Sequence, residues 1–263
     1  MAEYKIIVDS SCEIPASLKE DGRICFVPFR LEVNGVPIRD TGAIDTKTLL
    51  ERMAESKAFT NMACPSPDVF YNYISEGNEK RVYIITIASK LSGCYMSAML
   101  AKKLYEEKAN DKEIYVIDSK SISGGESQLA LRAIELEEQG VSGEELKKQL
   151  VSYRDKLRTD MVLNSFEAIK SNVKMPKFKE LVDSANNINL KENYDQLIES
   201  ISNALKNASS QTRVVITHCN NIIGAEKLRD LLVEKTGIKN IVIMSTSGIN
   251  SMLADMGGLI VSY

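Results

Sequence analysis

The sequence predicts a two-domain α/β protein, with an N-terminal domain around a parallel sheet over 1–158 and a C-terminal α/β domain over 159–263. The chain has 263 residues, which is long for one domain and sufficient for two small ones. Short β-branched runs alternate with segments of helical spacing, a pattern typical of a parallel sheet with crossover helices. The stretch 160–188 is polar and weakly periodic, and the alternation resumes after it, so we place the domain junction there.

In the N-terminal half, strands are predicted where apolar, β-branched residues run together and end in cap or turn residues. Asn34-Gly35 lies between Val33 and Val36 and predicts a tight hairpin, because both turn residues tolerate a positive φ. Pro67 suits the first turn of a helix. The predicted strands are 4–8, 25–29, 82–87 and 113–117, the hairpin covers 31–38, and the predicted helices are 46–56, 67–74, 92–108, 124–139 and 142–157.

The C-terminal half shows the same alternation of strands and helices after a less regular start. A short helical hairpin is predicted within 160–188, together with the domain junction. Gly257-Gly258 precedes a final apolar run that reads as the last strand. The predicted helices of this half are 194–208 and 225–235, and the predicted strands are 213–217, 240–244 and 259–263.

The composition argues against several classes of protein. Hydrophobic residues make up 44% and charged residues 26%, which are ordinary globular values. With 33 basic and 36 acidic side chains, the net charge of −3 lacks the basic excess of a nucleic-acid-binding protein, so we expect no nucleic-acid partner. No stretch of about 18 apolar residues predicts a membrane span. Residues 1–5 lack the layout of a signal peptide, so we expect a cytoplasmic protein.

The cysteines and the single histidine limit the chemistry. The five cysteines are scattered and include no CxxC pair, which favours unpaired thiols over a disulfide frame or a metal site. His218 alone cannot supply a zinc site built on two or three histidines. The sequence also contains no P-loop, GxGxxG or GxSxG motif. We therefore expect no metal and no cofactor.

Polar residues directly follow three of the predicted strands, at 9–11, 89–94 and 118–121. The carboxyl ends of parallel strands form the ligand crevice of such sheets, so Ser10, Ser119 and the serines of 89–94 can meet there. Each cluster taken singly also reads as an N-cap for the next helix. Together they predict a pocket rim rich in hydroxyl groups.

The segment Leu91-Ser92-Gly93-Cys94 carries the most information among these clusters. Gly93 allows a ligand to approach the backbone closely, and the amides at a helix start favour an anion. The Ser92 hydroxyl can donate a charge-assisted hydrogen bond to a carboxylate. Viewed alone, the segment is also compatible with a capped helix start.

Four segments, 8–12 (VDSSC), 63–67 (ACPSP), 88–98 (ASKLSGCYMSA) and 116–120 (VIDSK), occur in an order that resembles the motif order of the DegV family of fatty-acid-binding proteins. Segment 8–12 (VDSSC) resembles the family's VDSS start, and 63–67 (ACPSP) resembles its TSxPSP loop. Segment 88–98 (ASKLSGCYMSA) resembles its SSKLSGTYxSA motif, and 116–120 (VIDSK) resembles its VxDSK strand end. The match covers about the first 140 residues, and the SSKLSG-type motif is fairly specific.

This resemblance implies a long-chain fatty acid buried in a cleft between the two domains, with its tail in an apolar tunnel and its carboxylate held by hydroxyls of the TSxPSP and LSG loops. It also implies a carrier without enzymatic activity, which presents the fatty acid to the ATP-binding subunit of a fatty-acid kinase; we expect a monomer. The expected ligand-binding residues are Ser92, Gly93, Cys94, Met62, Ala63, Ser10, Ser119, His218 and Gly258.

The sequence departs from the family pattern around the head group. Met62 and Ala63 stand where the family has Thr and Ser, and a thioether cannot donate a hydrogen bond. Cys94 stands where the family has Thr. The family's C-terminal THxGPG-type loop is matched only loosely by 254–258, its histidine has no counterpart, and Asp255 would repel a carboxylate that it faced. These departures predict a weaker or remodelled grip on the head group.

Three functions remain open at the level of the sequence. The leading one is a fatty-acid carrier, and a second is the same scaffold binding a different small lipid or amphiphile. The third is a hydrolase that uses Ser92 with His218, which requires a hydrogen bond between the two side chains. His218 ends a predicted strand, and this position favours a structural role at a turn over a role in the cleft.

Overall fold

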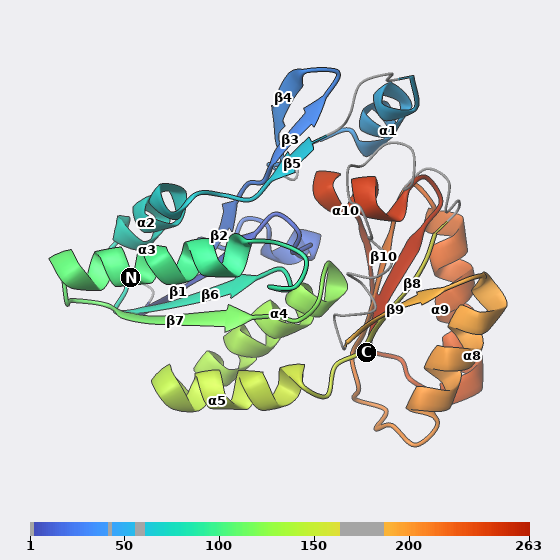
Figure 1. Cartoon of the computed structure of the whole chain (residues 1–263). Coiled ribbons are helices and arrows are strands. Elements are labelled where there is room, and N and C mark those ends of the chain that lie inside the picture. The colour runs from blue at the N-terminus through green and yellow to red at the C-terminus, as the bar shows by residue number, and fades with distance from the viewer. Residues whose placement is uncertain (1–2, 42–43, 56–60, 164–186) are drawn as a thin grey trace.

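The computed structural model describes residues 3–41, 44–55, 61–163 and 187–263, which form two large sheets and one small one (Figure 1). The first sheet is parallel, with the order β2-β1-β6-β7. The parallel sheet predicted for the N-terminal half is therefore confirmed. Its strands are β1 (Tyr4–Asp9), β2 (Ile24–Val27), β6 (Arg81–Thr86) and β7 (Glu113–Asp118).

Helices cover both faces of the first sheet, because its strands are apolar on both sides. Ile7 and Ile84 point to the face under α2 and α3, whereas Ile6 and Ile85 point to the face under α4 and α5. This alternation follows from the period of two in a strand. The helices are α2 (Pro67–Ser75), α3 (Cys94–Lys108), α4 (Gly124–Glu138) and α5 (Gly143–Arg154).

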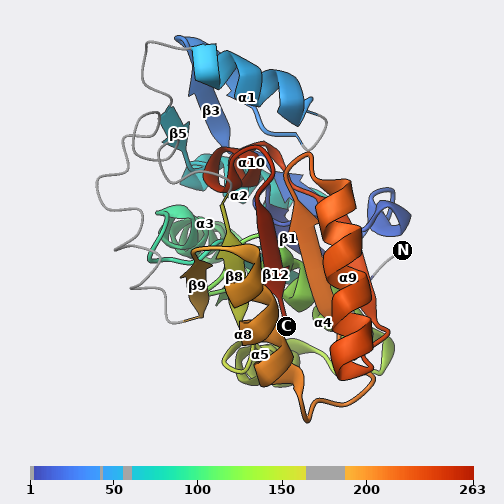
Figure 2. The ribbon, with the colours of Figure 1, turned by 90° about the vertical axis from the view of Figure 1, so that its right-hand side faces the viewer.

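The second sheet is mixed and has the order β11-β10-β12-β8-β9. Its central strand β12 runs antiparallel to both β10 and β8. One face is covered by α8 and α9, which lie side by side in Figure 2. The strands are β8 (Thr159–Val162), β9 (Ile188–Lys191), β10 (Val214–His218), β11 (Ile241–Ser245) and β12 (Leu259–Ser262), and the helices are α8 (Tyr194–Leu205), α9 (Ile222–Thr236) and α10 (Gly248–Ala254).

A small antiparallel sheet, β4-β3-β5, rises beside the first sheet (Figure 1). Its hairpin turns at Asn34 and Gly35, with φ values of 55° and 75°, as the sequence predicts. A short 3₁₀ helix (Ala16–Leu18) lies between β1 and β2. The remaining elements of this region are β3 (Arg30–Val33), β4 (Val36–Arg39), α1 (Thr46–Glu55) and β5 (Asn61–Ala63).

Helix α4 joins the two halves, since it packs on the first sheet and also against β10 and β12. A side chain at Gly124 could not fit there, because a Cβ would lie 2.8 Å from the Val215 side chain. Nearby, the Gln128 amide donates to the carbonyl of Ser262 at 3.0 Å. The two halves therefore share a close-packed junction, whereas the domain boundary at 158/159 stays a prediction.

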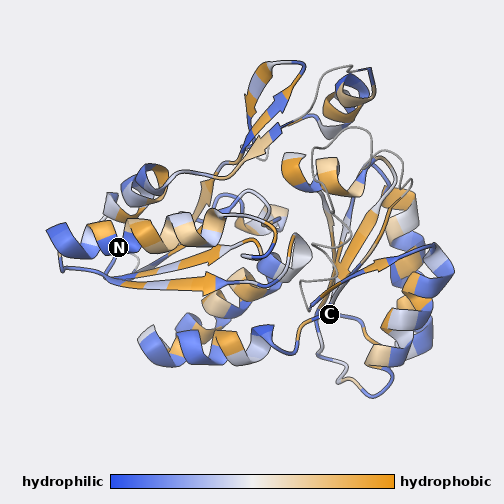
Figure 3. Ribbon diagram, in the orientation of Figure 1, coloured by the Kyte–Doolittle hydropathy of each residue, from blue (hydrophilic) through white to orange (hydrophobic). Residues whose placement is uncertain are grey.

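The hydropathy of the residues matches the arrangement of sheets covered by helices (Figure 3). The strands are apolar inside the molecule, and the outward faces of the helices are polar. Within the described ranges, no helix combines the length and the apolarity that crossing a membrane requires.

Most predicted elements agree with the structure to within a few residues, and several were missed. The strands β5, β8 and β9 and the helix α10 were not predicted. The strand predicted at 25–29 ends at Val27, because the chain turns there into β3. The predicted helical hairpin falls largely on 164–186, outside the described residues.

Candidate functional site

An apolar cavity of about 360 Å³ lies beside the start of α3, between the two halves of the chain. The first half supplies residues from β5, from the segment after β6 and from the loop before α3. The second half closes the cavity with two side chains of α10. The lining residues are Phe29, Met62, Ala63, Cys64, Ile87, Leu91, Ser92, Gly93, Ile249 and Leu253.

The loop from β6 to α3 is held by backbone hydrogen bonds that bring Ser92 and Gly93 to the cavity. The amides of Leu91 and Ser92 both donate to the carbonyl of Ala88, at 2.9 and 3.2 Å. The Ser92 hydroxyl accepts a hydrogen bond from the amide of Cys94 at 3.3 Å. Because α3 begins at Cys94, amides of its first turn have no partner inside the helix. This end of the cavity therefore offers one hydroxyl and the positive end of a helix dipole.

A buried pair of carboxyl groups lies behind the same loop. Asp9, at the end of β1, accepts hydrogen bonds from the Ile87 amide at 2.8 Å and from the Cys94 thiol at 3.1 Å. Burial raises the pKa of Asp9 to about 6, although these hydrogen bonds oppose the rise. Burial and the neighbouring charge of Asp9 raise the pKa of Glu126 well above its usual value. One carboxyl group of the pair formed by Asp9 and Glu126 is therefore favoured in its protonated form.

Among the described residues, no lysine, arginine or histidine lines the apolar cavity. In the part of the chain that the structure describes, Ser92 is the one side-chain hydroxyl on the cavity wall, while Met62 and Ala63 add only apolar atoms. Asp255 does not line the cavity either; its carboxylate accepts a hydrogen bond from the Met256 amide at 2.7 Å. The cavity can therefore hold an apolar chain, with a polar group placed against Ser92 and the start of α3.

The structure brings five of the nine expected ligand-binding residues to this region. Met62, Ala63, Ser92 and Gly93 line the cavity, and Cys94 is fully buried directly behind them. Their contact with a ligand stays a prediction.

Ser10 and Ser119 do not line the apolar cavity; Ser10 lines a second, more polar cavity, and Ser119 bonds within its own turn. The Ser10 hydroxyl donates to Asp40 at 3.1 Å and accepts from the Phe29 amide at 3.0 Å. The Ser119 hydroxyl donates to the carbonyl of Ser121 and accepts from the amide of the same residue, both at 3.0 Å. The Ser10 hydroxyl therefore links the end of β1 to residues that flank the β3–β4 hairpin, and the Ser119 hydroxyl stabilises the turn after β7. Neither serine is the N-cap of the helix that follows it, which was the other role that the sequence allowed.

His218 and Gly258 also lie outside the wall of the apolar cavity. The His218 Nδ1 atom accepts a hydrogen bond from the Asn221 amide at 3.2 Å, and burial lowers the pKa of the imidazole. No hydrogen bond joins His218 to Ser92 in the described structure, so the pairing that a hydrolase needs is not formed. Gly258 has no space for a side chain, because a Cβ would lie 2.2 Å from the carbonyl oxygen of Ala254.

Sequence reasoning missed the apolar lining of the cavity. Ile249 and Leu253 are spaced i,i+4 and share one face of α10, but this helix has only seven residues and gives a weak periodic signal. Phe29 and Ile87 are the last residues of two predicted strands, and Leu91 lies within the motif 88–98. The sequence offered one indication that these three residues line a cavity, namely that they are apolar and lie next to polar strand ends.

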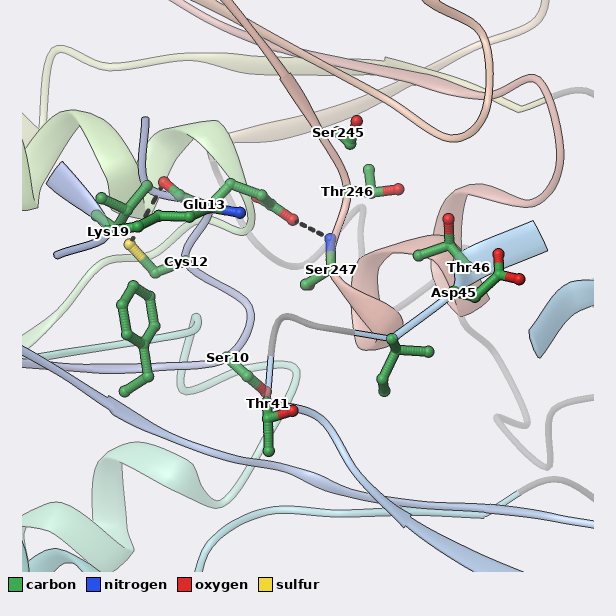
Figure 4. A pocket seen from close by; sticks show the side chains of 13 residues that line it. Ser10, Cys12, Glu13, Lys19, Thr41, Asp45, Thr46, Ser245, Thr246 and Ser247 are labelled. Atoms are coloured by element: carbon green, nitrogen blue, oxygen red, sulfur yellow. Dashed lines mark hydrogen bonds between the residues drawn. The ribbon is translucent and has the colours of Figure 1, made fainter. Parts of the chain in front are cut away.

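A second cavity, of about 420 Å³, lies between the segment after β1 and the segment that joins β11 to α10, and it is more polar (Figure 4). Glu13 and Ser247 face one another in it, and the Glu13 carboxylate accepts from the Ser247 amide at 2.8 Å. Burial raises the pKa of Glu13 to about 7. Asp45 and Lys19 complete its charged wall. With two carboxyl groups, this cavity is a poor place for the head group of a fatty acid.

Comparisons with known proteins agree on one family. The family model described as "Uncharacterised protein, DegV family" matches residues 3–190. A DegV domain-containing protein of Streptococcus gordonii is 27% identical over 99% of this chain and 98% of its own length. A second, from Streptococcus pneumoniae, is 29% identical over 99% of this chain and 98% of its own length.

Two solved structures share the fold over nearly the whole chain. A DegV family protein from Ruminococcus gnavus, refined with vaccenic acid, has a TM-score of 0.89 and 29% identity, covering 99% of both chains. The Streptococcus pneumoniae Fatty Acid Kinase (Fak) B3 protein loaded with linoleic acid has a TM-score of 0.86 and 26% identity, covering 100% of this chain and 99% of its own. The family match and these structures together show that this chain belongs to the DegV family.

Proposed function

We propose that this protein binds a long-chain fatty acid, with the acyl tail in the apolar cavity and the carboxyl group against Ser92 and the start of α3. The observation that carries the proposal is the cavity itself, which is apolar along its walls and ends at one hydroxyl and a helix N-terminus. The Ruminococcus and Streptococcus structures with bound vaccenic and linoleic acids support it.

The apolar tail supplies most of the affinity. A saturated tail of about 15 methylenes gains on the order of 0.8 kcal/mol per group, or roughly 12 kcal/mol before costs. Lost translation and the ordering of the chain cost several kcal/mol. The remainder supports tight binding even where the head group is held by few donors. The polar end then sets the orientation of the fatty acid.

The same proposal includes a partner that performs the chemistry. The similarity to a protein named as part of a fatty-acid kinase supports presentation of the bound fatty acid to an ATP-binding kinase subunit. In this scheme the kinase transfers phosphate to the carboxylate, and the present chain orients the substrate. The loaded protein, a kinase subunit and ATP should then yield acyl phosphate, and each component alone should not.

Native mass spectrometry of the purified protein, before and after organic extraction, tests the carrier function. A mass excess of one long-chain fatty acid that disappears on extraction is the expected result. A clean apo mass, with no uptake of added palmitate or oleate, would contradict it.

A neutral amphiphile is the second candidate ligand, and one observation favours it. No cationic side chain among the described residues lines the cavity, and the Asp9 carboxyl group lies behind the loop, where it accepts from the Cys94 thiol. A competition between palmitate and hexadecanol at pH 8 separates the two candidates. Palmitate is expected to bind more tightly if Ser92 and the α3 amides hold a carboxylate, whereas preference for the alcohol would favour the neutral ligand.

A further inference from the structure

A third hollow, of about 530 Å³, lies against the other side of the segment that walls the apolar cavity. The two spaces share Phe29, before β3, and Ala63 and Cys64, at the end of β5, so these residues of two segments form the wall between them. Its lining comes from the hairpin β3–β4, from the end of β5 and from the start of α2. Its lining residues are Pro28, Phe29, Arg30, Arg39, Ala63, Cys64, Pro65, Ser66 and Val69.

Two arginines face this hollow from adjacent strands. Arg30 of β3 is directly opposite Arg39 of β4, and on its other side Arg30 is opposite Ala63 of β5. The three residues therefore form one cross-strand row on the same face of the small sheet. Because Ala63 contributes no polar group, the row presents two positive charges beside a small side chain.

Neither arginine is neutralised within the described chain. Both are exposed, and no ion pair or hydrogen bond of Arg30 or Arg39 occurs among the described residues. Two partly buried arginines near other strand starts are paired, by contrast: Arg81 contacts Glu137 at 2.9 Å and Arg23 contacts Asp21 at 2.6 Å. Like charges placed directly opposite one another destabilise a strand pair. An anion between Arg30 and Arg39 would remove that repulsion.

Ser66 adds a hydroxyl to the same hollow. It precedes α2 as the N-cap, yet its side chain makes no capping hydrogen bond. The amides of Val69 and Phe70 bond instead to its carbonyl oxygen, at 3.1 and 3.4 Å. Asp68, the acidic residue in the first turn of α2, is exposed and does not line the hollow.

We propose that this hollow is a binding site for a phosphate group, held by the guanidinium groups of Arg30 and Arg39 and by the hydroxyl of Ser66. Two guanidinium groups with several N–H donors each match the oxygens and the double charge of phosphate better than the single charge of a carboxylate. The phosphate is either the free inorganic ion or the phosphate of a nucleotide. The site goes beyond the binding of a fatty acid and does not depend on it.

Isothermal titration calorimetry on the full-length protein at low ionic strength tests the site, with inorganic phosphate in one arm and ADP in the other. Saturable binding of phosphate is expected in the wild type. Arg30→Gln and Arg39→Gln should each weaken it about tenfold or more, since each removes a charged donor. A double substitution to lysine, Arg30→Lys with Arg39→Lys, should retain part of the affinity, because it keeps the charges and loses the forked geometry.

Arg158→Gln is the matched control, because Arg158 is also exposed and lines a different surface hollow of about 350 Å³. It should leave phosphate binding unchanged. Much tighter binding of ADP with the same dependence on Arg30 and Arg39 would identify a nucleotide as the source. No saturable binding, binding that survives loss of both arginines, or binding lost in Arg158→Gln would overturn the proposal.

Fatty-acid binding measured on the same variants keeps the two proposals separate. Palmitate uptake is expected to be unchanged in Arg30→Gln and Arg39→Gln, since neither residue lines the apolar cavity. Unchanged thermal unfolding of these surface variants confirms that any loss of phosphate binding is local.

Discussion

The thiol of Cys94 lies 3.1 Å from Oδ2 of Asp9 and donates to it, which joins the first residue of α3 to the last residue of β1. Both side chains are fully buried. The contact fixes the start of α3 against the parallel sheet, directly behind the residues that line the apolar cavity. Cys94, which the sequence suggested as a ligand contact, thus also positions the loop between β6 and α3.

Cys94 should be chemically inert in the folded protein. Burial first, and the adjacent Asp9 second, raise the pKa of the Cys94 thiol well above its usual value, and the thiolate is the reactive form. Iodoacetamide at pH 8 should leave Cys94 unmodified in native protein and alkylate it after denaturation. Peptide mass spectrometry measures this, and Cys64, which is partly exposed at the cavity, serves as the comparison site. Rapid native alkylation of Cys94 would show that the loop opens.

Replacing Ser92 by alanine should weaken fatty-acid binding by roughly 1.5–3 kcal/mol, because a charge-assisted hydrogen bond to the carboxylate is lost. Titration calorimetry with palmitate measures the change, and hexadecanol provides a ligand without the charge. Ser89→Ala is the matched control, since the Ser89 hydroxyl bonds to Asp118 instead and does not line the cavity. An unchanged affinity in Ser92→Ala would mean that Ser92 only caps α3 through its bond to the Cys94 amide.

Replacing Met62 by threonine should strengthen the binding of a fatty acid by about 1 kcal/mol, because it adds a hydroxyl donor to the cavity wall. Met62→Leu is the matched control, as it keeps the wall apolar and of similar volume. The ratio of palmitate to hexadecanol affinity is the measurement that isolates the head group. If that ratio does not change in Met62→Thr, the carboxyl group lies away from residue 62.

Stability should fall as the pH rises from about 4.5 to about 7. Glu13 is fully buried, and its pKa rises from 4.5 to about 7 on folding, so the folded state holds its proton more tightly than the unfolded state. The stabilisation from that proton is complete at pH values below the pKa of Glu13 in the unfolded state. It is lost as the pH rises through the pKa of Glu13 in the folded state. The expected loss of unfolding free energy is on the order of 1 kcal/mol or more across this range.

Urea unfolding at several pH values measures this dependence. Glu13→Gln should flatten the curve, because the amide does not ionise and can still accept from the Ser247 amide. Glu20→Gln, a change at an exposed acidic side chain, should leave the slope as it is. Asp9, with a pKa raised to about 6, contributes to the remaining slope in the same direction. A wild-type curve that is flat between these pH values would contradict the raised pKa of Glu13.

The sequence determined those features that depend on neighbouring residues. The apolar runs 4–8, 82–87 and 113–117 predicted buried strands that the structure contains, because a parallel strand covered on both faces must be apolar throughout. Asn34-Gly35 predicted its hairpin for a similar local reason, since the turn needs two positive φ values. The four ordered motifs were sufficient to indicate the DegV family, which the family model confirms.

Only the tertiary structure decided which of the candidate residues share one space. Ser10, Ser92 and Ser119 all follow strands, yet only Ser92 reaches the apolar cavity, because the Ser10 hydroxyl bonds to Asp40 and to the Phe29 amide and the Ser119 hydroxyl bonds within its own turn. Ile249 and Leu253 are far from the motifs in the chain and reach the cavity through α10. Such long-range packing depends on strand order and on how the two halves dock, and neither is encoded in the spacing of nearby residues.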